Sequence, residues 1–243
     1  MTVPRRRTRA RRGDGDLLRA DLLRAAEDLL VEAGDSSGVT LRGVALRVGV
    51  TTPSVYLHFA DKAALVDAVC LSVWDELGRR MDASAAGAPD PFEALRRRGM
   101  AYVRFGMDHP VQYRVLMMQP PPPGGPAAAG AEAEAARDCF AHVLEAVAAC
   151  VGVGVFHGDP KPLALSLWAA AHGAVSLLIS KPDFPWPADL DAFVDGCIRM
   201  AGMGLAVMSR VPSEHHTHDP RRLAGQLDGL VARLHTDREG DLA

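Results

Sequence analysis

The sequence lacks the residue spacings that mark common catalytic and nucleotide-binding sites. It contains no Gly-x-Gly-x-x-Gly, Walker or His-Glu-x-x-His pattern, and no nucleophile–base pair or paired carboxylates are recognisable. We interpret GDSSG, at residues 34–38, as a plain loop. The sequence therefore does not predict an enzyme, and nothing in it requires a cofactor.

Cysteine is scarce and unpaired. The four cysteines show no Cys-x-x-Cys spacing, and each lies in an apolar helical pattern: Cys70, Cys139, Cys150 and Cys197. This favours buried free thiols in a reducing cytoplasm. Three histidines gather in a polar tail, namely His215, His216 and His218. Without cysteine or acidic partners they do not predict a metal site.

No secretory signal or membrane association is predicted either. The Arg-rich start leads into a polar amphipathic helix instead of an apolar signal region. The most apolar run, residues 163–179, is short for a bilayer span and contains Ser and His. We expect it to form a buried helix.

A strong excess of basic residues is also missing, because the formal net charge is −3. The charge is unevenly distributed, however. Residues 1–62 hold 11 Lys and Arg against 8 Asp and Glu, whereas the rest holds 16 against 22. A weakly basic head on an acidic body fits contact with DNA at one end of the molecule.

Apolar residues recur at helical spacing along the chain, and no strand pattern or repeat is visible, which predicts an all-α fold. We expect a disordered basic arm at 1–15, a three-helix head at 16–62, a helical body at 63–210 and a polar tail at 211–243 that can form a last short helix. The arm is either a solvated tail or a DNA-tracking segment. The Pro/Gly-rich segment 119–130 predicts a mobile loop.

Residues 40–62 predict a helix-turn-helix. Thr40 suits the N-cap of the first helix, and Gly49 suits its end, because glycine readily adopts a left-handed backbone. A second helix begins near residue 51 or 52, with Pro53 in its first turn. Asp61 caps a third helix.

The second helix has an inward and an outward face. Val55 and Phe59 lie four residues apart, so they can anchor it to a core. The remaining side chains point outward and suit base edges and phosphate oxygens: Thr51, Thr52, Ser54, Tyr56 and His58.

The pattern T-x-R followed by G-V-x-x-P-S-x-Y-x-H-F-x-x-K-x-x-L, within residues 40–65, resembles the DNA-binding domain of the TetR family of transcriptional repressors. In the body, Trp168-x-x-x-His172-Gly173 and HPVQYRVLMM at 109–118 are similar to the C-terminal domain of one TetR subgroup. The resemblance covers roughly residues 16–208.

This resemblance implies a homodimer that places each second helix in a major groove of a double-stranded DNA operator. Thr40 and Arg42 correspond to phosphate contacts in the family motif. Thr52, Pro53 and Ser54 correspond to base-reading positions. Three further residues correspond to contacts with the DNA backbone: Tyr56, His58 and Lys62.

The resemblance also implies an apolar or amphipathic small-molecule effector. The candidate pocket residues are bulky or adaptable apolar side chains: Trp74, Met100, Met107, Tyr113, Met117, Phe140, Trp168 and His172. Each can equally be an ordinary core residue, and His172 can be a satisfied core or interface histidine.

The 163–180 helix is apolar on two faces, so it needs cover on both sides, and a twin subunit can provide the second. We expect the dimer interface to include Ala170, Ala174, Phe193, Cys197 and Ala201. The sequence does not decide which face of the 163–180 helix meets the partner subunit.

These patterns predict a sequence-specific, ligand-responsive repressor that binds a palindromic operator as a dimer. The alternative is a helical dimeric small-molecule-binding or scaffold protein without a specific DNA target. That alternative leaves the outward array of Tyr56, His58 and Lys62 unexplained.

Overall fold

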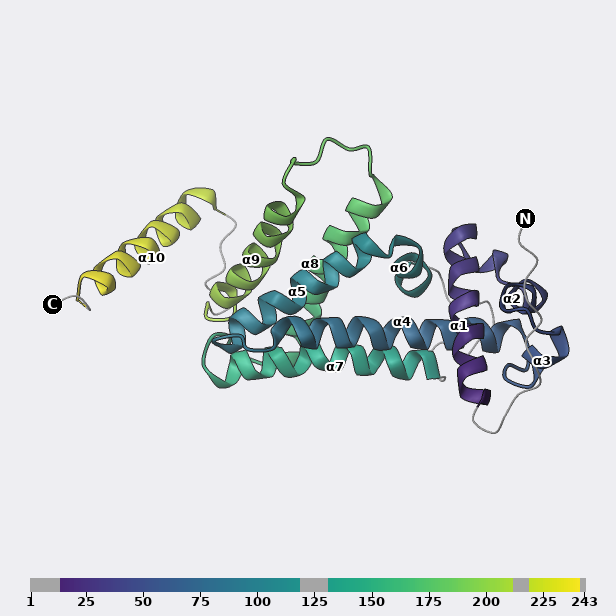
Figure 1. The fold of residues 1–243 in the computed structure, drawn as a ribbon. Helices are drawn as coiled ribbons and strands as arrows, with labels where there is room; N and C mark the ends of the chain where they lie inside the picture. The colour runs from purple at the N-terminus through teal and green to yellow at the C-terminus, as the bar shows by residue number, and fades with distance from the viewer. Residues whose placement is uncertain (1–13, 119–130, 212–218, 241–243) are drawn as a thin grey trace.

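The computed structural model of the chain describes residues 14–118, 131–211 and 219–240 (Figure 1). These residues form α-helices and one 3-10 turn, and no strand occurs among them, as the sequence predicts. Most of the Arg-rich arm, the Pro/Gly-rich segment and the three tail histidines lie outside the described residues.

The head consists of α1 (Asp14–Ala33), the short turn η1 (Ser36–Gly38), α2 (Leu41–Val48) and α3 (Thr52–Tyr56). Helix α1 begins two residues before the expected start of the head. Its inner face carries Leu22, Ala26 and Leu30. The spacing of Leu18, Leu22, Ala26, Leu29 and Ala33 in the sequence predicts one inner face that extends to Ala33. Ala33 is instead exposed, because the buried stripe ends with Leu30 one turn earlier.

The expected caps of the head are confirmed. Thr40 Oγ1 accepts a hydrogen bond from Gly43 N at 3.0 Å, and Asp61 Oδ1 accepts one from Ala64 N at 2.8 Å. Gly49 ends α2 with φ of 78°. These caps satisfy backbone groups that would otherwise remain unpaired at the helix ends.

The body is built around α4 (Lys62–Ala85), which runs from the head along the length of the body (Figure 1). Helices α5 (Pro91–Asp108) and α7 (Ala131–Gly152) pack along it. The short α6 (Pro110–Met117) touches both α1 and α4. A single apolar cluster runs from Leu22 in the head to Val194 in the body, so head and body share one core.

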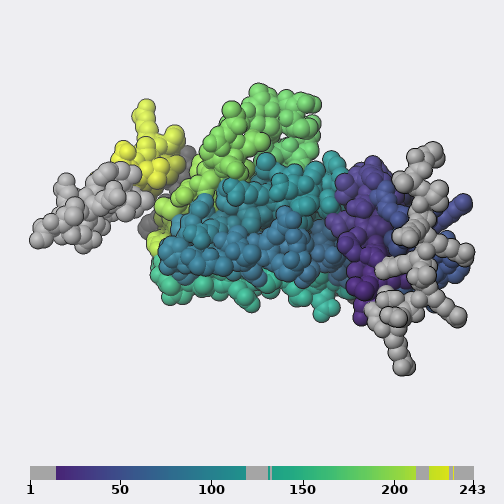
Figure 2. All heavy atoms as spheres, in the orientation of Figure 1, coloured from purple at the N-terminus to yellow at the C-terminus, as the bar shows by residue number. Residues whose placement is uncertain are grey.

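Helices α8 (Pro160–Ser180) and α9 (Leu190–Met208) pack together on the α5 side of the body. Their connection projects beyond the remainder of the body (Figure 2). By length and composition, α8 is the one helix in the described part of the chain that could span a membrane. This is weak evidence, because helices of soluble proteins pass the same test.

The expectation that 163–179 forms a buried helix is wrong for the single chain. Only 22% of its most apolar window is buried, and the buried side chains lie along one face, which includes Ala164, Ala171 and Val175. The helix is apolar all round while its neighbours α5, α7 and α9 cover one side. An uncovered apolar face therefore remains on α8.

Beyond the body, α10 (Pro220–Gly240) forms the expected last helix, longer than anticipated. It lies past the end of the body opposite the head (Figure 1). Its Leu223 and Leu227 are exposed.

Two buried helical glycines provide a matched test of packing. A Cβ on Gly106 would lie 2.3 Å from Val175 Cγ2, whereas a Cβ on Gly78 would meet His142 at an ordinary 3.6 Å. Replacing glycine by alanine inside a helix gains about 1 kcal/mol of propensity. We expect Gly78→Ala to be neutral or stabilising by about that amount.

By contrast, we expect Gly106→Ala to destabilise the protein by about 1–3 kcal/mol through overpacking. Urea unfolding followed by circular dichroism measures both variants. Equal unfolding free energies for the two would contradict the close contact of α5 with α8.

Candidate nucleic-acid interface and ligand cavity

The turn between α2 and α3 is held by backbone bonds and two buried side chains. Val50 N donates to Ala45 O at 2.9 Å, which closes the corner after Gly49. Val55 and Phe59 are buried, as expected from their spacing. The Arg19 guanidinium lies 5.2 Å from the centre of the Phe59 ring, so α1 covers this anchor from behind. The position of α3 is thus fixed by the head's own core.

The predicted DNA-contacting side chains remain accessible around this anchor. Those on the surface are Thr40, Arg42, Thr51, Pro53, Tyr56 and Lys62, whereas Thr52, Ser54 and His58 are half-buried. The Thr51 and Ser54 hydroxyls pair with each other at 2.8 Å. The α2–α3 segment lies at the end of the molecule opposite α10 (Figure 1).

Leu57 is the member of this surface that sequence reasoning missed. It is 84% exposed, directly after α3 and between Tyr56 and His58. The available signal was its position, since residue 57 cannot share the inward face of Val55 and Phe59. Leu57 thus adds an exposed apolar side chain to the surface around α3.

Not every basic residue of the head is available to an external anion. Arg47 donates to both carboxylate oxygens of Glu32 at 2.7 Å, which ties α2 to α1. Lys62 Nζ donates to Ser37 O at 3.2 Å. The Lys62 side chain is nevertheless exposed.

The GDSSG segment also spells Gly-x-Ser-x-Gly, the letter pattern of a nucleophile elbow. That elbow is a strand-to-helix turn. Here the segment forms η1 between two helices, and Asp35 caps it by accepting from Ser37 N at 2.7 Å. Hydrogen bonds from the Ser37 side chain and from its backbone hold the pKa of Asp35 below its usual value. The segment is a capped loop, as first interpreted.

A cavity of about 410 Å³ lies in the body among α4, α5, α6, α7 and α8. It brings together five of the predicted pocket residues: Trp74, Met117, Phe140, Trp168 and His172. Tyr113 lies behind its wall, fully buried against His172. Met100 and Met107 lie apart from it, beside other surface hollows. Tyr102 and Cys139 also line the cavity, and sequence reasoning missed both.

A chain of hydrogen bonds forms the polar wall of this cavity. Trp168 Nε1 donates to the Tyr102 hydroxyl at 3.1 Å, and the Tyr102 and Tyr113 hydroxyls lie 3.0 Å apart. The Tyr113 hydroxyl lies 2.6 Å from His172 Nδ1. Burial lowers the pKa of His172 and raises that of Tyr102 to about 12. The wall is therefore uncharged at neutral pH.

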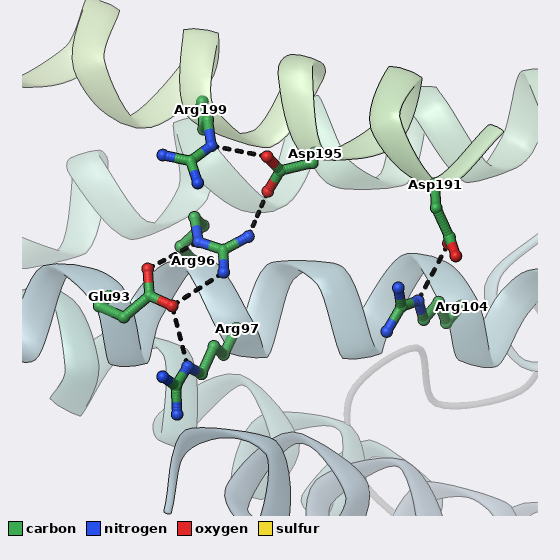
Figure 3. Close-up of polar contacts among 7 residues, drawn as sticks. All are labelled: Glu93, Arg96, Arg97, Arg104, Asp191, Asp195 and Arg199. Carbon is green, nitrogen blue, oxygen red and sulfur yellow. Dashed lines mark hydrogen bonds and ion pairs between the residues drawn. The ribbon is translucent and has the colours of Figure 1, made fainter. Parts of the chain in front are cut away.

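A second cavity of about 240 Å³ lies mainly between α5, α8 and α9. It shares four lining residues with the first: Met81, Tyr102, Val143 and Trp168. Its rim carries a network of ion pairs (Figure 3). Arg96 binds both Glu93 and Asp195, and Asp195 also binds Arg199 at 2.6 Å. Hydrogen bonds from Arg96 and Arg97 lower the pKa of Glu93 to about 2. The network links α5 to α9 beside the cavity.

Large apolar side chains are exposed on α8 and α9. Leu177, Met200 and Met203 are 55%, 70% and 56% exposed. A Cβ added at Gly173, Gly196 or Gly204 would meet nothing within 4 Å. Among the predicted interface residues, Ala170 is exposed, whereas the following are half-buried: Ala174, Phe193, Cys197 and Ala201.

Two of these half-buried residues make contacts within the body of the same chain. Phe193 packs against Trp186, and Ala201 lines the smaller cavity. Within 14–118, 131–211 and 219–240, no cluster of three metal-ligating side chains was found.

An N-terminal helix-turn-helix joined through one long helix to an all-α body defines a class of bacterial regulators. Residues 22–69 match the family described as bacterial regulatory proteins, tetR family. Residues 95–201 match the tetracyclin repressor-like C-terminal domain. Together with the fold, these two matches place the chain in the TetR family.

Individual relatives agree with this assignment. The tetracycline repressor protein class D of Escherichia coli is 34% identical over 89 residues, or 36% of this chain and 39% of that repressor. The match thus spans well under half of this curated relative. A structure of a protein of unknown function from Rhodococcus sp. RHA1 is 26% identical with a TM-score of 0.66, covering 78% of this chain and 95% of that one.

A TetR family transcription regulator from Marinobacter aquaeolei VT8 shares the fold, with a TM-score of 0.60 at 21% identity. That match covers 79% of this chain and 97% of the regulator.

The half-buried His172 makes stability depend on pH. Its pKa is lowered by burial, so the unfolded chain binds the proton more tightly than the folded one. Its contribution is present above the unfolded pKa of about 6.5 and is lost as pH falls through the folded value. We expect His172→Gln to reduce the loss of stability between about pH 7.5 and 5.

Urea unfolding at several pH values measures this effect. Tyr113→Phe is the control, because it removes the hydrogen-bond partner but leaves the half-buried imidazole of His172 to titrate. An unaltered pH profile in His172→Gln would contradict the assignment.

Proposed function

We propose that this protein is a ligand-responsive transcriptional repressor of the cytoplasm that binds a palindromic operator as a homodimer. The observation that carries the proposal is the accessible array around α3, held on the buried pair Val55 and Phe59. Short hydroxyls, a phenol and a lysine suit the mixture of base and phosphate contacts that DNA presents. The family assignment supports the same function.

In this proposal, residues 16–62 form the DNA-binding head, and residues 63–210 form the effector-binding and dimerisation body. Thr40, Arg42, Tyr56, His58 and Lys62 contact the DNA backbone. The base-reading group comprises Thr51, Thr52, Pro53 and Ser54, to which we add Leu57.

Dimerisation is supported by the uncovered apolar face of α8 and α9. A five-residue α3 offers too few contacts for tight specific binding by one head. Two heads on one dimer gain through effective concentration when their spacing matches half-sites about one helical turn apart or a multiple of it. Exposed Leu177, Met200 and Met203 would be buried by the partner.

Coupling between ligand and DNA is supported by the elements that line the larger cavity. Trp74 belongs to α4, whose first turn lies in the head, and Met117 belongs to α6. Helix α6 contacts α1 directly, where Gln112 Nε2 donates to Glu27 Oε1 at 3.3 Å. A ligand that displaces α4 or α6 would change the spacing of the two heads. The shift cannot exceed the ligand's differential affinity for the two states.

A scaffold or binding protein without a DNA target would use the same body and cavity. It would have no use for the accessible α3 array. A band-shift assay with the DNA upstream of the protein's own gene separates the two functions, since only the regulator retards a specific fragment at physiological salt.

We expect four head substitutions to fall into two classes. Lys62→Ala and Tyr56→Phe should weaken operator and random DNA alike, because phosphate contacts carry no sequence information. Lys62→Ala should also reduce the slope of log K against log salt by about 1 per subunit. Thr52→Ala and Ser54→Ala should change the preference among operator variants by about 1–3 kcal/mol.

Fluorescence anisotropy at several salt concentrations measures these effects. Arg79→Ala is a matched control, because it removes an exposed cation from the body portion of α4. Identical losses in all four head variants would contradict the division of roles.

We expect Met200→Arg and Ala170→Arg to yield folded monomers with poor operator affinity. Both positions are exposed in the single chain, so the arginine is harmless there, but in a dimer it would be buried close to its symmetry mate. Ala174→Arg is less diagnostic, because Ala174 is already half-buried. Light scattering reports mass and circular dichroism reports folding.

Val31→Arg, at another exposed apolar residue on α1 of the head, should leave the mass unchanged. If both interface variants remain dimers with full operator affinity, the interface lies on another face.

A further inference from the structure

We propose that a surface hollow of about 450 Å³ between α4 and α5 binds the linked phosphate groups of an oligophosphate. Its volume falls within the range of small-molecule sites. The hollow shares no lining residue with the larger cavity and only Arg96 with the smaller one. The site is therefore separate from the candidate effector cavity, and it does not rest on the proposed function.

Arginine side chains line both walls of this hollow. Helix α4 contributes Arg80, and α5 contributes Arg97 and Arg104. Arg97 and Arg104 are seven residues apart, so they lie on one face of α5, about 10 Å apart along its axis. The side chains of Arg80, Arg97 and Arg104 are 41%, 34% and 55% exposed. A dissolved anion can therefore reach all three.

The three guanidinium groups are oriented by carboxylates that leave their terminal nitrogens available. Each group binds one carboxylate through Nε: Arg80 to Glu76 at 2.6 Å, Arg97 to Glu93 at 2.9 Å and Arg104 to Asp191 at 3.1 Å. None of these carboxylates lines the hollow. In Figure 3 the Nη atoms of Arg97 and Arg104 point away from the carboxylates that hold Nε. A guanidinium has five N–H donors, so about four in each group remain for a ligand.

A contact between the two helices places the α4 arginine beside those of α5. The Arg80 guanidinium lies 5.5 Å from the centre of the Phe105 ring, which belongs to α5 and is almost fully buried. Attraction between a cation and an aromatic ring holds the guanidinium in this position. An anion in the hollow would thus contact α4 and α5 together.

The other polar side chains of the lining add no further donor. Arg96 uses all three of its nitrogen atoms on carboxylates of α5 and α9 (Figure 3). The Ser84 hydroxyl donates to Met81 O at 2.7 Å. Asp108 is the one acidic side chain among the described residues that line the hollow. The available donors are therefore those of three arginines, opposed by one carboxylate.

This donor set suits linked phosphate groups. The planar fork of arginine matches phosphate oxygens, and hydrogen bonds between charged groups are among the strong ones. A single phosphate cannot span two α5 arginines about 10 Å apart along the helix, whereas a chain of phosphates presents oxygens along the hollow. The one aromatic ring of the described lining, Phe105, is buried, so no base-stacking surface is present there. The hollow thus favours the phosphate chain itself.

Calorimetry on the full-length protein, without DNA, Mg²⁺ or phosphate buffer, tests the proposal with tripolyphosphate, orthophosphate and ATP. We expect tripolyphosphate to bind about ten-fold or more tightly than orthophosphate, the effect of at least one additional charged hydrogen bond. ATP should bind within three-fold of tripolyphosphate, because the phosphate chain alone is recognised. ATP that binds more than ten-fold more tightly would require a nucleoside contact and would overturn this assignment.

Substitutions locate the anion. Arg97→Gln and Arg104→Gln should each weaken tripolyphosphate about ten-fold. Asp108→Asn should strengthen it about two-fold, as expected from removing one exposed like charge. Arg79→Gln is the matched control, because Arg79 is an exposed α4 arginine that binds Asp75 through Nε at 3.1 Å but does not line the hollow. That variant should keep its affinity within two-fold.

The proposal is overturned if tripolyphosphate does not bind, or if orthophosphate binds equally well. Unchanged affinity in both α5 variants would place the anion elsewhere, such as on the Arg-rich residues 5–12, and would overturn it as well. Circular dichroism verifies that each variant is folded. Both α5 variants should give a normal band shift without oligophosphate, since neither residue belongs to the head. Failure of the phosphate site and failure of the regulator are therefore distinguishable.

Discussion

The apolar stripe along α4 is the constraint on which the remaining structure depends. Its first turns bury Leu65 and Val69 among the helices of the head, and its later turns bury Leu77 and Met81 in the body. No break in the helix separates these two roles. Because both halves of the stripe must remain buried, the head cannot change its orientation without a matching change in the packing of the body.

Local chemistry made the head predictable from sequence. Thr40, Gly49, Pro53 and Asp61 mark helix ends through hydrogen bonds and backbone angles that a reader of the sequence can anticipate. The four-residue spacing of Val55 and Phe59 also indicates correctly that both side chains face the core of the head. The prediction that Ala33 faces the core was wrong, because an alanine at the end of an amphipathic helix fits either the buried or the exposed face.

The body was less predictable, since its features depend on residues distant in sequence. Tyr102 was missed, although it contacts Trp168 66 residues away and contributes to both cavities. Met100 and Met107 resemble the cavity methionine Met117 in type but lie elsewhere. Helix α8 is apolar on all sides, and this pattern does not indicate whether its second face is buried by the same chain or by a partner subunit. Only the packed structure shows which face is uncovered.

The continuity of α4 has a mechanical consequence. A helix of 24 residues spans about 36 Å, and so acts as a lever between the cavity region and the head. A tilt of about 5° over that length displaces one end by about 3 Å, close to the roughly 3.4 Å that separates successive base pairs. Rearrangements smaller than one side-chain diameter around Trp74 would then be converted, at the far end, into an error of about one step along the DNA.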